Sequence, residues 1–81
     1  MMRDEKYYEK LFENYPDVVN IKTFREMLGG ISEQAARRLM RENRVRHYFV
    51  SLTYMIPKVW IIEYVLSEDY EEYKEKLKVK I

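Results

Sequence analysis

The 81-residue sequence predicts one mainly α-helical domain that carries a small β-hairpin. Three features of the chain lead to this prediction. Apolar residues recur at helical spacing through the first half of the chain, a β-prone stretch lies around residue 50, and only two glycines and two prolines interrupt these patterns. A chain of this length has room for one hydrophobic core, so we expect residues 1–81 to form a single domain.

The first expected helix belongs to an accessory segment, residues 4–15. Asp4 is a suitable N-cap, and the apolar side chains that follow it fall within about 140° of arc on one helix face. Pro16 disfavours helical geometry in Tyr15, so the helix is expected to end there. The next residues, Val18–Val19, favour a short extended piece.

Residues 20–43 have the dimensions of a helix-turn-helix. Asn20 can cap a helix that Gly29–Gly30 ends, and Ser32 can cap a third helix that runs to about Asn43. About three or four residues, glycine among them, join the two helices. This is the connection that the motif requires.

The β-prone residues 45–56 flank Ser51–Leu52 and predict a β-hairpin, which makes the expected fold a winged helix-turn-helix with extra helices at both ends. Pro57 suits the first position of a last core helix, residues 57–66. That helix is apolar on almost every side, so we expect the first helix to cover it. Residues 67–81 are expected to form a charged surface helix that frays.

Basic charge is concentrated in the middle of the chain. The net charge is +1, yet residues 22–58 carry eight lysines and arginines against three glutamates, and both flanking segments are acidic. A nearly neutral total can therefore hide a basic surface.

One face of the third helix carries the most specific pattern. At 3.6 residues per turn, Gln34, Arg37, Arg38 and Arg41 project within about 100° of one another, opposite a run of apolar side chains. Guanidinium and amide groups make bidentate contacts to guanine, adenine and phosphate, whereas many charged faces are simply solvated. Pairing of Glu33 or Glu42 with an arginine would neutralise part of this charge. The candidate DNA-binding residues are Lys22, Ser32, Gln34, Arg37, Arg38, Arg41, Arg44, Arg46 and Lys58.

Other functions find little support in the sequence. The chain has no cysteine and a single histidine, His47, so we expect no metal or cofactor site. No nucleophile and base stand in a recognisable pattern, which argues against an enzyme. Gly29–Gly30 fits a turn better than a phosphate loop, and Trp60 is expected in the core. No apolar run approaches the roughly 20 residues that span a bilayer, and we expect a cytoplasmic, nucleoid-associated protein.

Two stretches resemble the excisionase-type (MerR-like) winged helix-turn-helix family: NIKTFREMLGGIS at residues 20–32 and RLMRENRVRH at residues 38–47. TYMIPK at residues 53–58 is similar to the family's wing return, so the resemblance covers about residues 18–66. It implies a recognition helix in the major groove of double-stranded DNA and a wing against the minor groove or backbone. It also implies a role in assisting an integrase, in which the protein binds and bends DNA at the ends of a mobile element. The candidate partners are a tyrosine integrase and further copies of the chain that bind DNA cooperatively.

The chain departs from the family at the tip of the wing. The family commonly has glycine and basic residues there, whereas this chain has the uncharged sequence FVSLT at residues 49–53, with an apolar tip that contains Val50 and Leu52. The end of the chain also lacks the heptads of a coiled-coil dimer. Two alternatives to excision remain open: a small transcriptional repressor, and a protein-interaction module that uses the tyrosine-rich first helix and the apolar tip.

Overall fold

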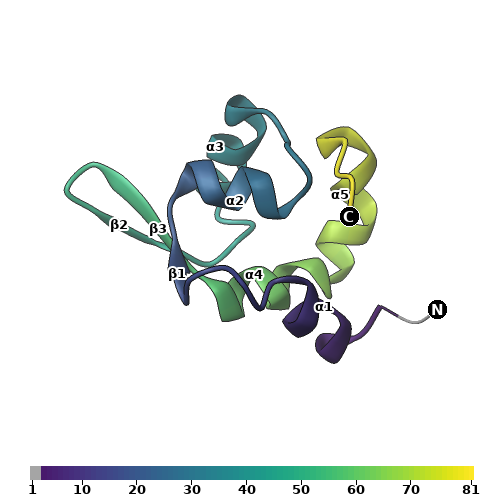
Figure 1. Ribbon diagram of the computed structural model, residues 1–81. Coiled ribbons are helices and arrows are strands. Elements are labelled where there is room, and N and C mark those ends of the chain that lie inside the picture. The colour runs from purple at the N-terminus through teal and green to yellow at the C-terminus, as the bar shows by residue number, and fades with distance from the viewer. Residues whose placement is uncertain (1–2) are drawn as a thin grey trace.

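A computed structural model, which describes residues 3–81, places five helices around a small three-stranded antiparallel sheet (Figure 1). The helices are α1 (Glu5–Leu11), α2 (Ile21–Met27), α3 (Glu33–Arg41), α4 (Lys58–Val65) and α5 (Glu68–Leu77). The strands are β1 (Val18–Val19), β2 (Tyr48–Val50) and β3 (Thr53–Pro57). The expected mainly helical chain with a β-hairpin is confirmed.

Side-chain caps fix where the first three helices begin. Asp4, Asn20 and Ser32 each accept a hydrogen bond from the backbone N–H three residues later, at 2.9–3.0 Å. All three starts agree with the sequence prediction, because a cap depends only on residues within one turn. Gly29 and Gly30, both at positive φ, then turn the chain from α2 into α3, as expected.

The end of α1 was predicted wrongly. The helix stops at Leu11 rather than near Tyr15. The carbonyl oxygens of Phe12 and Tyr15 turn instead toward the Lys58 ammonium, which donates to them at 3.3 and 2.9 Å. A contact from a residue more than 40 positions away therefore replaces the last helical turn.

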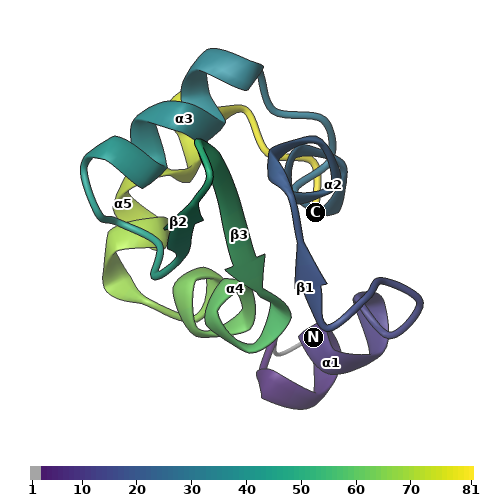
Figure 2. The same ribbon diagram turned by 90° about the vertical axis from the view of Figure 1, so that its left-hand side faces the viewer.

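The sheet has the strand order β1–β3–β2. Val19 of β1 pairs with Ile56 of β3, and Val50 of β2 pairs with Thr53, so Ser51–Leu52 form a two-residue loop. Figure 2 shows β1 and β3 side by side, with α4 below the end of β3 and α1 below β1. The β2–β3 hairpin, called the hairpin below, projects on one side of α3, while α5 lies on the other side (Figure 1).

The core lies between the helices and the sheet, and its apolar side chains come from every helix. The expected packing of α1 on α4 is confirmed, but α4 is not covered all round: Val59 is 66% exposed. The prediction that Trp60 lies in the core was wrong. Its half-buried ring packs against Tyr48 with the ring centroids 5.1 Å apart, and the Arg46 guanidinium lies over it at 4.4 Å.

The expected charged surface helix is confirmed as α5, but it is docked on the core rather than fraying. Tyr70 and Leu77 are only 2% and 3% exposed. Arg44 donates to Asp69 at 2.6 Å, and its guanidinium lies 4.4 Å from the ring centroid of Tyr73. These contacts hold α5 beside α3 and so place it next to the candidate site.

The segment after α5 crosses the turn between α2 and α3, which makes Gly29 sensitive to substitution. Lys80 donates its backbone N–H to the Leu28 carbonyl at 3.2 Å, and a Cβ on Gly29 would lie 2.6 Å from the Lys80 Cβ. We expect Gly29→Ala to lower the free energy of unfolding by about 2–3 kcal/mol, because a positive φ costs about 1–2 kcal/mol and the clash adds to it. Gly30→Ala, at φ +93° with open space around it, is the control and should cost about 1 kcal/mol. If urea titrations show equal losses of unfolding free energy for the two variants, the segment after α5 does not pack against Gly29.

The buried tyrosines predict unfolding at alkaline pH. Burial raises the pKa of Tyr70 to about 12 and that of Tyr64 further still. A folded-state pKa above the unfolded value gives stability that is complete below about pH 10 and is lost as the pH rises through the folded value. Tyr70→Phe removes one ionisable group whose hydroxyl has no hydrogen-bond partner among residues 3–81. Circular dichroism should show that this variant unfolds at a higher pH, whereas Tyr48→Phe, at an exposed position, should leave the transition unchanged. If Tyr70→Phe unfolds at the same alkaline pH as the wild type, ionisation of Tyr70 does not drive the transition.

Candidate nucleic-acid interface

Helix α3 has one buried and one exposed face. The buried face consists of Ala36, Leu39 and Met40, each at most 1% exposed. The exposed face carries Gln34, Arg37, Arg38 and Arg41, called the stripe below. The two faces follow from the spacing of apolar residues along one short helix. Burial of the apolar face fixes the direction in which the stripe points.

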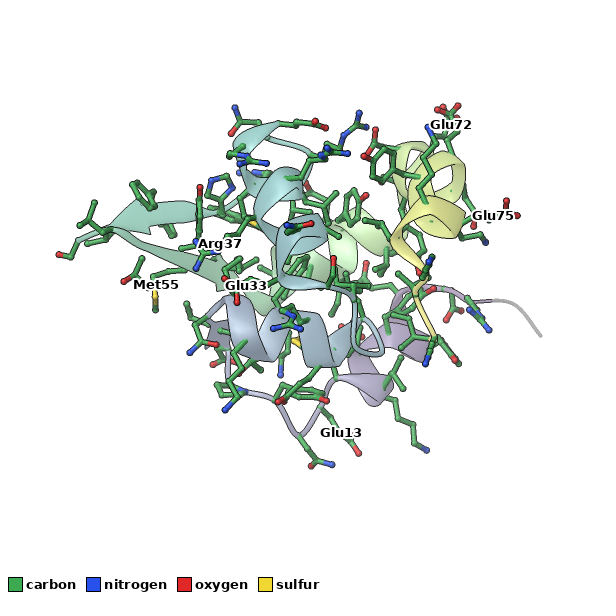
Figure 3. All side chains as sticks on the ribbon, turned by 90° about the horizontal axis from the view of Figure 1, so that it is seen from above. Glu13, Glu33, Arg37, Met55, Glu72 and Glu75 are labelled. Carbon is green, nitrogen blue, oxygen red and sulfur yellow. The ribbon has the colours of Figure 1, made fainter. Side chains whose placement is uncertain are left out.

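The three arginines of the stripe differ in their partners. Arg37 donates from Nε to the Glu33 carboxylate at 3.0 Å, the pairing expected one turn apart, and Figure 3 shows both residues on α3. Over residues 3–81, no carboxylate lies within 4.0 Å of the guanidinium of Arg38 or Arg41. These two exposed cations are therefore available to a ligand.

A groove of about 530 Å³ runs between α3 and α5. Its α3 wall contains the whole stripe together with Ser32. The Ser32 hydroxyl oxygen accepts from the Ala35 N–H at 3.0 Å, and its own proton remains free to be donated. Tyr73 and Lys76 of α5 form the opposite wall. The groove is thus rich in side chains that can donate hydrogen bonds to an anion.

Sequence reasoning missed Tyr73 and Lys76 because it treated α5 as a loose surface helix. A signal was present: Tyr70, Tyr73 and Leu77 recur at intervals of three and four residues, the spacing of a helix face that packs on a core. Glu75 of α5 points away from α3 in Figure 3, so it does not close the groove.

A second groove, of about 380 Å³, lies between α3, the start of α2 and the hairpin. Lys22, Arg25 and Arg37 line it from the helices, and Leu52 and Thr53 line it from the hairpin. Glu33 also lies there and is within 3.9 Å of Arg25, so it neutralises part of the charge. Arg37 lines both grooves, and α3 therefore stands between two concave surfaces that carry basic side chains.

Three of the candidate residues are engaged elsewhere in the fold. Arg44 donates to Glu42 at 2.7 Å as well as to Asp69, and its hydrogen bond holds the pKa of Glu42 below the ordinary value. Arg46 donates to Glu63 at 3.3 Å. Lys58 is held by the backbone carbonyls after α1, and its side chain is 17% exposed. The structure does not bring these three cations together with the stripe.

Other chemistry is scarce over the described part of the chain. His47 lies with Nδ1 at 2.8 Å from the Val45 carbonyl oxygen, a local contact. Residues 3–81 contain no cluster of three histidine, cysteine or acidic side chains suited to a metal ion. None of the helices in this range is long and apolar enough to cross a membrane.

The tip of the hairpin is apolar and exposed. Leu52 is 88% exposed and Val50 is 57% exposed. Leu52 lines the second groove, and Val50 pairs with Thr53, which lines the same groove.

Comparison with protein-family models, with curated proteins and with solved structures finds no match to this chain.

Proposed function

We propose that this chain is a winged helix-turn-helix protein that binds double-stranded DNA, with α3 as the recognition helix and the hairpin as the wing. The observation that carries this proposal is the exposed stripe, in which the guanidinium groups of Arg38 and Arg41 have no carboxylate within 4.0 Å among residues 3–81. An α-helix fits the major groove, which is about 12 Å wide, and arginine and glutamine there make bidentate contacts to guanine and adenine.

The two grooves beside α3 supply the positions for the DNA backbone. With α3 in the major groove, one phosphate strand passes on each side of the helix. Lys22 faces the strand on the hairpin side, and Lys76 faces the strand on the α5 side. Arg25 lies beside Lys22 but is engaged by the Ile31 carbonyl and by Glu33. Contacts of this kind set the register of the protein on the duplex, while base contacts from the stripe select the sequence.

The biological role that we propose is that of an excisionase-like accessory factor for a tyrosine integrase. This role is supported by the resemblance over residues 18–66 to the excisionase-type family. A transcriptional repressor would use the same surface. An integrase gene next to the coding sequence supports excision, whereas a promoter that the protein occludes supports repression.

The stripe predicts which substitutions weaken DNA binding. We expect Arg38→Ala and Arg41→Ala each to cost about 1–3 kcal/mol of binding free energy if the side chain contacts a base edge. The probe is the best duplex that the wild-type protein selects from a random-sequence pool, and the readout is fluorescence anisotropy. Arg46→Ala is the matched control, because Arg46 is equally cationic but pairs with Glu63 away from the stripe. Equal losses for all three variants would mean that general charge, rather than the stripe, binds the duplex.

The dependence on salt gives a second test. Contacts to about four to six phosphates predict that the logarithm of the association constant falls with the logarithm of salt concentration with a slope of roughly −4 to −5. Lys22→Ala should reduce that slope by about one, whereas Gln34→Ala should change sequence preference and leave the slope alone. A flat dependence would refute DNA binding by this surface.

A further inference from the structure

The loop of the hairpin holds two residues in an unfavourable backbone conformation. Ser51 and Leu52 have φ values of +50° and +64°. Two-residue hairpin loops with positive φ at both positions strongly prefer Asn-Gly or similar pairs, because the left-handed region costs an ordinary residue about 1–2 kcal/mol. Leucine therefore occupies a position that glycine or asparagine would fill at lower cost in free energy.

The packing of the free protein does not compensate for this cost. Leu52 is 88% exposed, and its neighbours across the loop, Val50 and Phe49, are 57% and 56% exposed. No charged residue occurs between Tyr48 and Tyr54. Backbone strain combined with an exposed apolar tip is typical of a segment that acts on a partner.

The surroundings of the tip indicate what that partner is. Leu52 lines the same groove as Lys22, and among residues 3–81 no carboxylate lies within 4.0 Å of the Lys22 ammonium. Arg25 and Arg37 also line the groove, but both pair with Glu33 there. A ligand that fills the groove therefore contacts the Lys22 cation and the apolar tip together. A phosphate strand satisfies Lys22, because each phosphate carries a negative charge. Leu52 cannot neutralise phosphate, so it serves a surface beyond the strand, which on a duplex is the minor groove. This placement favours DNA over a purely apolar protein surface.

We propose that the tip is an apolar wedge: Leu52 enters the minor groove beside the site of α3, inserts between two base pairs and kinks the duplex. Proteins that bend DNA from the minor groove use leucine and similar side chains in this way, and partial unstacking costs a few kcal/mol per step. The proposal rests on the DNA binding proposed above.

The decisive variant is the double substitution Ser51→Asn/Leu52→Gly. It gives the loop the sequence that its backbone prefers, so the hairpin should become more stable while the wedge is lost. The control is Ser51→Asn, which relieves strain at one position and keeps Leu52. Any loss of binding by the double variant then cannot result from a damaged fold, and thermal denaturation verifies this point for each protein.

The measurements use the duplex selected by the wild-type protein, labelled at both ends for energy transfer and carrying 2-aminopurine at the expected step. We expect the double variant to bind roughly tenfold more weakly, because one leucine side chain is no longer buried. The bend and the 2-aminopurine signal should disappear, the salt slope should stay the same, and Ser51→Asn should behave like the wild type.

The outcomes separate the wedge from DNA binding itself. If the double variant bends and binds the duplex like the wild type while Arg38→Ala binds weakly, the wedge is wrong and the recognition helix stands. If the wild-type protein selects no duplex, both proposals fall. If the double variant loses self-association measured without DNA and keeps its bend, the tip is a protein contact and the wedge is overturned.

Discussion

The burial of the apolar face of α3 is the constraint on which the candidate site depends. Ala36, Leu39 and Met40 have no freedom to turn outward, so the residues between them must face solvent. The two elements beside α3 are fixed in turn: β1 pairs with β3 and positions the hairpin, and Arg44 ties α5 to the loop after α3. One packing contact thus orients the stripe, and the rest of the fold shapes the grooves on either side of it.

Cations of the same type perform two different tasks in this chain. Arg38 and Arg41 are left without acidic partners among residues 3–81, whereas Arg44, Arg46 and Lys58 bind groups of the protein itself. Their partners lie 25, 17 and up to 46 positions away, except for the Glu42 contact of Arg44. A basic residue that already has a partner would have to break that contact to bind phosphate. The number of basic residues in the sequence therefore overstates the positive charge that is available to bind DNA.

The same difference in range explains which features could be predicted from the sequence. Helix starts, the Gly29–Gly30 turn and the two faces of α3 depend on residues within one or two turns, and the local pattern predicted them. The early end of α1, the partial exposure of Trp60 and the docking of α5 depend on contacts between distant segments. Lys76 could therefore be assigned to the groove only from the structure, because its place beside α3 follows from the burial of Tyr70 and Leu77. The apolar tip was visible in the sequence, but its backbone strain was not.

The near neutrality of the chain bears on how such a surface would discriminate among DNA sequences. Nonspecific affinity comes mainly from charge, and a chain with a net charge of +1, whose basic middle lies between two segments of net negative charge, attracts DNA only weakly from a distance. Two free arginines and an apolar tip instead act only on close contact. Base contacts favour binding to the correct sequence, and a wedge favours binding at a base-pair step that unstacks easily. Under the proposed function, the protein therefore gains specificity from the same scarcity of charge that limits its general attraction to DNA.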